Sequence, residues 1–325
     1  MTAEAVRAAA RNLVVTAEGA NRRLDNYLGS VLRDVPRTLI YRIIRTGEVR
    51  VNGRRGKPAQ KLAAGDTIRV PPLQHHGDGP FALPQERLTA FESTILYEDD
   101  RVIVVDKPTG MAVHGGSGLA YGLIDIARAA RPASPRIDLV HRLDRPTSGC
   151  LMFAKDMPSL RALHDALAQQ RVSKHYLALV AGRFPRQPTV VDVPLDVRHR
   201  EAHERHTVAS AVGVAAHTTF RLVRRFARCA LVSAEPATGR THQIRVHAAH
   251  LGHPLAGDTR YGDPMFNAEL AALGLRRLFL HAHRLAFELG GHHCLEAPLP
   301  ADLHSVLQAL ESRENFHDTT GQPDD

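Results

Sequence analysis

The sequence predicts an α+β protein in two parts: a small module of two helices and a hairpin, then a larger domain of mixed, mainly antiparallel sheets with short flanking helices. The chain has 325 residues, of which 43% are hydrophobic, so it is long enough for about two domains and apolar enough to bury a core in each. Its excess of basic over acidic residues lies in one short segment. Beyond that segment, strand patterns are interrupted irregularly by helical ones, which favours α+β sheets over a regular βαβ array.

The net positive charge of the chain comes from residues 22–70. This segment holds twelve Lys and Arg residues against four Asp and Glu residues, an excess equal to the net charge of +8 of the whole chain. The remaining residues are therefore balanced in charge. A local excess of this size is typical of a surface that binds a polyanion such as a nucleic acid. The alternative is an ordinary solvated face.

Two short helices are expected near the start of the chain. Residues 1–21 are expected to be mobile apart from one short strand. An amphipathic helix follows over residues 24–32, because apolar side chains recur there at helical spacing. The second helix has Pro36 at its first position, an apolar face over residues 39–44, and Gly47 just past its end.

A small basic hairpin follows the second helix. Val49-Arg50-Val51 alternates apolar and basic residues, and the Asn52-Gly53 pair after it is the strongest short signal for a hairpin turn. Residues 67–70 read as a further strand. Residues 73–90 are rich in Pro and Gly and show little periodicity, so we expect a linker there.

The string RRLDNYLGSVLRDVPRTLIYRIIRTGEVRVNGRRGKPAQKLAAGDTIRV, with its order of helix, helix and basic hairpin, resembles the S4 RNA-binding domain. We assign residues 22–72 to this domain. The resemblance implies a module of the αL type that contacts structured RNA through its phosphates, in agreement with the charge count. The side chains expected to bind RNA are Arg37, Arg42, Arg45, Arg50, Arg54, Arg55 and Lys57.

Residues 91–313 form the expected larger domain, and residues 314–325 are expected to be a disordered tail. Apolar and β-branched runs predict strands over residues 101–105, 150–154, 217–223 and 229–234, and a late pair or one long strand over 278–289. Helical spacing predicts helices over residues 160–169, 241–251 and 301–310.

The stretch LVHRLDRPTSGCLM is the most informative in this domain. It places Asp144 between Arg142 and Arg145, in a loop punctuated by Pro and Gly that leads into an apolar strand. A rigid sheet would hold such a carboxylate at the edge of a site. The alternative for an isolated Asp is a surface ion pair with its two neighbours.

Four stretches in the same order resemble the motifs of the RluA-type pseudouridine synthases: DKPTGMAVHGGSG, HRLDRPTSG, SKHYLALVAG and TGRTHQIRVHAAHLGHPLAGDTRYG. The resemblance implies a pseudouridine synthase domain with Asp144 as the catalytic aspartate. It assigns Arg245 as the cation that keeps Asp144 ionised, with Arg240 as the competing assignment and an RNA-phosphate contact as its expected role. Tyr176 would stack on the target base, and without the resemblance it would read as a half-buried strand residue.

The target uridine must leave the stacked helix, and by the same resemblance Arg142 would fill the space left in the RNA. His141 and Ile244, in the same motifs, are expected beside the substrate. The reaction breaks the glycosidic bond from C1′ to N1, turns the base and rejoins it through C5, so neither cofactor nor metal is expected. The carboxylate could attack C6, attack C1′, or take the 2′ proton to give a glycal.

The motifs are most similar to the branch of this family that modifies several uridines of large-subunit (23S) ribosomal RNA. A second rRNA branch and tRNA-directed relatives are the alternatives, and so is an RNA-binding ribosome-assembly factor without catalytic activity. The expected partner is therefore 23S rRNA, with no obligate protein partner and a monomer as the default state.

The rest of the sequence gives little sign of other function classes. The three cysteines are far apart and form no C-x-x-C pair, which favours a reducing cytoplasm. No run of about 18 apolar residues predicts a membrane span. Histidine clusters such as His242, His247, His250 and His253 lack an H-E-x-x-H pattern, so no metal site is expected.

Overall fold

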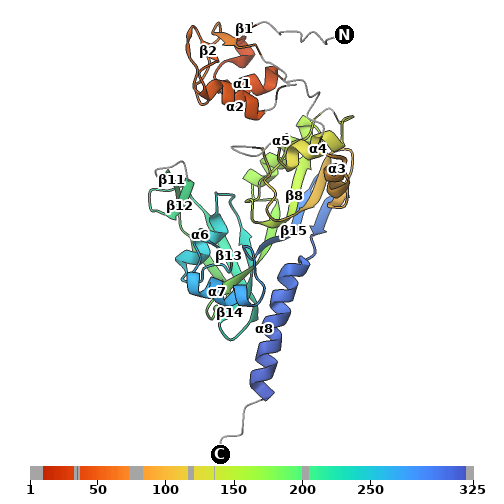
Figure 1. Ribbon diagram of the computed structural model, residues 1–325, viewed down its shortest axis with the longest axis vertical. Coiled ribbons are helices and arrows are strands. Elements are labelled where there is room, and N and C mark those ends of the chain that lie inside the picture. The colour runs from red at the N-terminus through yellow and green to blue at the C-terminus, as the bar shows by residue number, and fades with distance from the viewer. Residues whose placement is uncertain are drawn as a thin grey trace, which may run out of the picture. The chain divides into compact units, whose positions relative to one another are not determined.

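The computed structural model describes residues 10–32, 35, 37–72, 83–115, 121–134, 136–199 and 205–319. Contacts divide the chain into two compact units (Figure 1). The first comprises Met1–Arg87 with His114–Asp125, and the second comprises Leu88–Val113 with Ile126–Asp325. The predicted linker falls mainly on residues outside the described ranges, so the predicted domain limits stay predictions.

The small unit is a four-stranded antiparallel sheet packed against two helices. Its sheet runs in the order β1-β4-β2-β3, and the predicted N-terminal strand is its edge strand β1, paired with β4. The helices α1 and α2 bury their apolar faces against this sheet, as their helical spacing predicts. The elements are β1 (Arg11–Val14), α1 (Leu24–Val31), α2 (Arg37–Arg45), β2 (Arg50–Val51), β3 (Arg54–Arg55) and β4 (Thr67–Val70), with a short 3-10 turn, η1 (Ala17–Gly19).

The Asn52-Gly53 turn joins β2 to β3 as the sequence predicts. Both residues have positive φ angles, 49° at Asn52 and 78° at Gly53, the conformation that a two-residue hairpin requires. The Asn52 amide also donates to Asp66 and accepts from the backbone N–H of Thr67, at 2.7 and 2.8 Å. These bonds fix the hairpin against β4, so the exposed arginines of β2 and β3 stand on a rigid support.

The large unit is built on one ten-stranded sheet. The main path runs β10-β13-β14-β9-β15-β8-β6-β5, with β16 beside β15 and β7 beside β8. Every neighbouring pair is antiparallel except β15 with β8, which confirms the prediction of a mixed, mainly antiparallel sheet. The strands are β5 (Ile95–Glu98), β6 (Val102–Lys107), β7 (Asp138–Leu139), β8 (Ser148–Ala154), β9 (Ser173–Ala181), β10 (Thr189–Asp192), β13 (His217–Arg225), β14 (Cys229–Pro236), β15 (Leu280–Glu288) and β16 (His292–Glu296).

A separate hairpin and short helices complete the elements. The hairpin pairs β11 (Leu195–His199) with β12 (Arg205–Ala209). The helices are α3 (Gln85–Glu92), α4 (Leu123–Ala130), α5 (Met157–Ala168), α6 (Gln243–His250), α7 (Pro264–Ala272) and α8 (Ala301–Thr319). Among the described residues, no helix is both long and apolar enough to cross a membrane.

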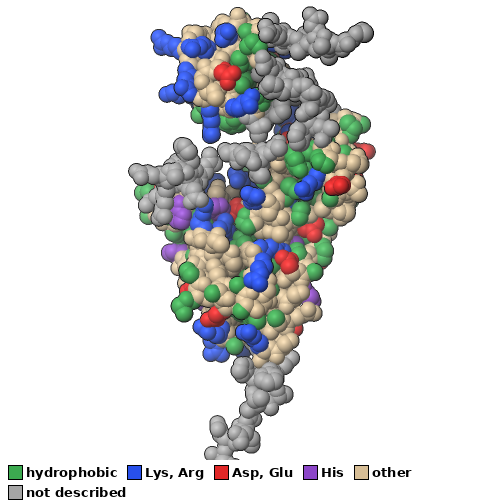
Figure 2. Space-filling view, viewed as in Figure 1, with side chains coloured by type: hydrophobic (Ala, Val, Ile, Leu, Met, Phe, Trp, Pro, Cys, Tyr) green, Lys and Arg blue, Asp and Glu red, His purple; other side chains and the backbone are tan. Residues whose placement is uncertain are grey.

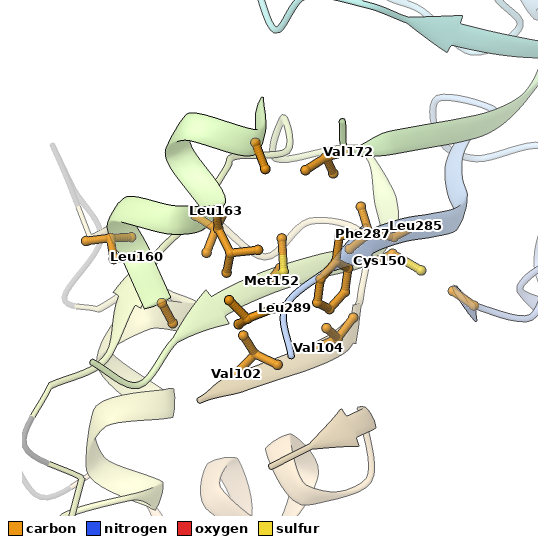
Figure 3. Close-up of a cluster of buried hydrophobic side chains, with 14 residues drawn as sticks. Val102, Val104, Cys150, Met152, Leu160, Leu163, Val172, Leu285, Phe287 and Leu289 are labelled. Atoms are coloured by element: carbon orange, nitrogen blue, oxygen red, sulfur yellow. The ribbon is translucent and has the colours of Figure 1, made fainter. Parts of the chain in front are cut away.

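Strand β8, which follows the loop that contains Asp144, is part of a core cluster of buried hydrophobic side chains. All seven residues of β8 are buried, as is typical of a central strand covered on both faces. In Figure 3, Leu160 and Leu163 of α5 lie over side chains from β6, β8 and β15. The labelled strand residues are Val102, Val104, Cys150, Met152, Leu285 and Phe287. The start of β8, four residues after Asp144, is therefore fixed by the core.

Helix α8 is longer than the sequence predicts. It continues from Ala301 to Thr319, whereas a helix ending at residue 310 and a disordered tail from 314 were expected. Once a helix is nucleated, each added residue gains a backbone hydrogen bond at little further cost, so a polar segment can extend it. Residues 320–325 of the expected tail lie outside the described residues.

Candidate active site

Asp144 lies in the loop between β7 and β8, and its side chain is only 17% exposed. Backbone hydrogen bonds tie this loop to the segment after β6. The N–H of Gly110 donates to the carbonyl of Arg145 at 2.9 Å, and the Thr109 hydroxyl donates to the carbonyl of Pro146 at 2.9 Å. Two segments of the chain, one from each of the first two motifs, therefore hold the carboxylate in place.

Lys107 ties these two segments together from inside. Its side chain is fully buried, and its ammonium donates to the carbonyls of Pro108, Met111 and Arg145 at 3.0, 2.9 and 3.3 Å. Burial lowers the pKa of Lys107 to about 7, although the charge of Asp144 opposes this effect. Lys107 belongs to the DKPTG stretch of the first motif, but its residue type alone predicts no role for it.

Arg245 brings a positive charge to Asp144 from helix α6. Its Nη1 lies 3.4 Å from Oδ2 of Asp144. The rest of its guanidinium is held by Asp258, through Nε to Oδ2 at 2.7 Å and Nη2 to Oδ1 at 2.8 Å. The Asp258 side chain has no exposed surface, and it also accepts the backbone N–H groups of Arg260 and Tyr261. Asp258 thus fixes the direction in which Arg245 presents its remaining N–H groups.

The charges of this cluster support one another. Burial alone would lower the pKa of Arg245, but the hydrogen bonds and charge of Asp258, together with the charge of Asp144, raise it above its ordinary value. Burial alone would raise the pKa of Asp258, but its bonds to Arg245 lower it. The pair is therefore ionised at neutral pH, which leaves Asp144 beside a permanent cation.

His242 and Tyr261 complete the surroundings of Asp144. His242 lies directly before α6 with a left-handed backbone, φ 56°. Its Nε2 lies 3.9 Å from Oδ2 of Asp144, and its Nδ1 lies 2.8 Å from the hydroxyl of Tyr261. The Tyr261 ring also packs against the Arg245 guanidinium, 5.0 Å from ring centre to Cζ. Neither residue was among the candidate site residues, although both belong to the last motif.

Tyr176 faces the same region from strand β9. It is a buried strand residue, paired with Ala234 of β14. Burial raises its pKa well above its usual range, and the negative charge of Asp144 adds to this effect. A small cavity of about 160 Å³ also touches Tyr176, but its other lining residues, such as His175 and Arg284, do not include Asp144 or Arg245. This cavity is therefore separate from the cluster around Asp144.

The other predicted site residues differ in exposure and in the groups that they contact. Arg142 is exposed in the Asp144 loop, and Ile244 is buried in α6 next to Arg245. The His141 ring is directed to the sheet, since its Nε2 accepts the backbone N–H of Met152 at 3.3 Å. Arg240 is exposed and donates to the carbonyl of Ala215. Arg245, and not Arg240, is therefore the arginine beside Asp144.

The predicted RNA-binding side chains of the small unit are exposed, and Figure 2 shows Lys and Arg side chains across its visible face. The exposed members are Arg42, Arg45, Arg50, Arg54, Arg55 and Lys57. The side chain of Arg37 lies outside the described residues. Arg55 donates to the backbone carbonyl of Arg45, which holds the hairpin against the end of α2.

The described part of the chain contains no cluster of three or more His, Cys, Asp or Glu residues that could hold a metal ion. Around Asp144 the site presents the charged side chains of Arg245 and Asp258. The Asp144 carboxylate, only 17% exposed and paired with a fixed arginine, is suited to act as a nucleophile or a base.

Comparisons with known proteins identify both units. Residues 22–68 match the family described as S4 domain, and residues 101–250 match the family described as RNA pseudouridylate synthase. The chain is 45% identical over 303 residues to ribosomal large subunit pseudouridine synthase C of Yersinia pestis, covering 92% of this chain and 95% of that protein. The protein of the same name from Escherichia coli strain K12 is 44% identical over 307 residues, covering 92% and 96%.

Solved structures show the same fold. Human RNA pseudouridylate synthase domain containing 4 is 25% identical and superposes with a TM-score of 0.60, covering 70% of this chain and 97% of that one. Human RNA pseudouridylate synthase domain containing 1 is 24% identical, with a TM-score of 0.53 over 71% of this chain and 96% of that one.

Proposed function

Because the chain belongs to the RNA pseudouridylate synthase family and is a pseudouridine synthase, we propose that it converts uridines of large-subunit (23S) ribosomal RNA to pseudouridine, with Asp144 as its catalytic carboxylate. The choice of RNA is supported by relatives that carry this specificity in their names and match the chain over nearly its whole length. The S4 domain supports it independently, because it presents a basic surface suited to structured RNA.

The reaction is an isomerisation within one nucleotide. The bond from C1′ to N1 breaks, a bond from C1′ to C5 forms, the C5 proton leaves and N1 gains a proton, so atoms and electrons balance without an added reactant. Asp144 acts at the sugar or the base, and attack at C6, attack at C1′ and removal of the 2′ proton all remain compatible with its position. An ionised oxygen is needed in each case.

The contact between Asp144 and Arg245 is the observation that carries the proposal. Arg245 is locked by Asp258, so its Nη1 holds a fixed positive charge 3.4 Å from Oδ2 of Asp144. Such a preorganised charge requires no rearrangement during the reaction. Tyr176, buried nearby on β9, would stack on the target base, and Ile244 would border it from α6.

The target uridine must be flipped out of the RNA stack, at a cost of about a few kcal/mol. Exposed Arg142 is suited to fill the space it leaves, because a guanidinium can stack and form hydrogen bonds at once. Arg240, exposed at the surface, would contact a phosphate. Action at several uridines, as a monomer in the cytoplasm without an obligate protein partner, stays a prediction.

The test uses full-length 23S rRNA transcribed with uridine that carries tritium at C5, since each pseudouridine formed releases one tritium to water. The wild-type chain should release tritium, and Asp144→Asn should lower the single-turnover rate at least about 100-fold. RNA affinity should be retained. Asp165→Asn, an exposed carboxylate on α5, is the control and should react like wild type.

Three results would contradict the proposal. Release by Asp144→Asn at the wild-type rate would remove the catalytic role of Asp144. Release from a tRNA transcript but not from rRNA would overturn the choice of substrate. No release by the wild type from either RNA would favour the alternative of an assembly factor without catalytic activity.

A further inference from the structure

His242 has an orientation that its place at the start of a helix does not explain. A residue directly before a helix usually turns its side chain back to the helix N–H groups. His242 makes no such bond, and its left-handed backbone directs the ring between two other groups. Nε2 faces Oδ2 of Asp144 at 3.9 Å, and Nδ1 meets the Tyr261 hydroxyl at 2.8 Å.

The Tyr261 hydroxyl favours one of the two protonated forms of the neutral His242 ring. Its oxygen accepts the backbone N–H of Thr207 at 3.1 Å, so its own proton is available for a second partner. Donation of that proton to Nδ1 of His242 makes Nδ1 an acceptor. A neutral imidazole with an accepting Nδ1 carries its proton on Nε2. The N–H of His242 then points to Asp144.

We propose that His242 is a positioning residue of the synthase site, an inference that rests on the proposed role of Asp144. As a neutral donor it faces Oδ2, the same oxygen that Arg245 approaches at 3.4 Å. The distance of 3.9 Å is longer than a hydrogen bond, and such contacts in catalytic sites often tighten when substrate binds. Holding Oδ2 with two donors leaves Oδ1 of Asp144 to react.

The surroundings of the ring keep it neutral at neutral pH. Burial lowers the pKa of His242, the facing charge of Asp144 opposes this, and the charges of Arg245 and Arg260 lower it again. The charge of Asp258 raises the pKa of His242, with the smallest effect of these groups. The ring of His206 on β12 is a further titratable neighbour, tilted by 40° against the Tyr261 ring at 5.1 Å between ring centres. Protonation in acid would turn His242 into a cation that binds Asp144 and withholds it from the substrate.

The experiment measures single-turnover tritium release from the labelled 23S transcript over a range of pH, with melting temperature and RNA affinity for each variant. His242→Ala should lower the rate about 100-fold at neutral pH, the loss typical of one preorganised donor. His242→Gln, whose amide can place an N–H where Nε2 was, should remain within about tenfold of wild type. His250→Gln, an exposed histidine on the same helix, is the matched control and should be unchanged.

Tyr261→Phe separates positioning from a merely structural role. Without the hydroxyl, Nδ1 loses the donor that stabilises the neutral ring, so His242 is protonated at higher pH. The fall in rate on the acid side of the pH profile should therefore begin at higher pH in Tyr261→Phe. In His242→Gln, the part of this fall that comes from protonation of the histidine should disappear.

Rates within twofold of wild type for His242→Ala across the pH range would overturn the inference. So would a His242→Gln variant as slow as His242→Ala, combined with a fall in rate on the acid side that begins at the wild-type pH in Tyr261→Phe. In both cases tritium release by the wild type and its loss in Asp144→Asn would leave the proposed function standing. If the wild type released no tritium, the proposed function itself would fail.

Discussion

The buried pair of Arg245 and Asp258 offers a quantitative test of how the site is held. In Asp258→Asn the side chain keeps its shape but loses its charge. Arg245, with a side chain only 8% exposed, would then face Asp144 alone at 3.4 Å. Removing the charge of one partner of such a buried pair costs about 3 to 5 kcal/mol of folding free energy. For a domain of this size that corresponds to a fall in melting temperature of roughly 6 to 20 °C.

Calorimetry or circular dichroism on the full chain provides the assay, since the chain contains no Trp for fluorescence. The pair of Arg277 and Asp302 is a matched control. It has the same two-pronged geometry, with Nε to Oδ2 at 2.6 Å and Nη2 to Oδ1 at 3.1 Å. Its guanidinium is as buried as that of Arg245, at 9% exposed, but its carboxylate is 54% exposed, so water already reaches this pair and can solvate the charge of Arg277 when Asp302 loses its own. Asp302→Asn should therefore cost only about 1 kcal/mol.

A double variant decides whether the cost comes from the unpaired charge. Arg245→Met should itself be destabilising, because it leaves Asp258 buried without a cation. Arg245→Met combined with Asp258→Asn should cost clearly less than the two single changes added together. Additive effects would refute the reasoning, and so would an Asp258→Asn variant no less stable than Asp302→Asn.

Three further predictions concern the rest of the molecule. Removing two exposed charges of the S4 hairpin region, Arg54→Ala with Lys57→Ala, should reduce the slope of log affinity for rRNA against log salt by roughly 1.5 without changing the tritium-release rate of bound RNA; an unchanged slope would mean that these side chains do not contact phosphates. Hydrogen bonds from Arg131 lower the pKa of Glu98 to about 2, so its stabilisation is complete above its ordinary value of 4.5 and is lost as pH falls through about 2. Glu98→Gln should therefore destabilise the chain by no more than about 3 kcal/mol at pH 7 and by much less near pH 2, as measured by urea unfolding. Gly149→Ala should lower the melting temperature strongly, because φ is +110° and a Cβ would lie 2.3 Å from a carbonyl oxygen of β15; a wild-type melting temperature would contradict the close parallel pairing of β8 with β15.

Local signals explain which elements the sequence predicts well. The hairpin at Asn52-Gly53 and the helices of the small unit follow from turn chemistry and apolar spacing within a few residues. The late apolar run over residues 278–289, expected as a pair or one long strand, is the single strand β15. Its parallel pairing with β8 could not be predicted, because it joins segments more than 130 residues apart and depends on a backbone approach that only Gly149 allows.

Some residues of the candidate site are predictable from the sequence and others are not. The resemblance of the motifs named Asp144 and Arg245, and the structure brings them within 3.4 Å. It did not single out Lys107, Asp258 or His242, because their roles depend on contacts that form only on folding. Lys107 contacts backbone carbonyls, Asp258 contacts the Arg245 guanidinium, and His242 faces the Asp144 carboxylate. The available signal was their position inside the same motifs, with Asp258 and His242 in the last one and Lys107 in the first.

The most direct test of the central claim is a map of pseudouridines in the ribosomal and transfer RNA of cells whose own copy of this protein carries Asp144→Asn. We expect specific uridines of 23S rRNA to remain unmodified in these cells, with the pseudouridines of tRNA unchanged. A full set of 23S pseudouridines in the variant cells, or losses confined to tRNA, would contradict the claim.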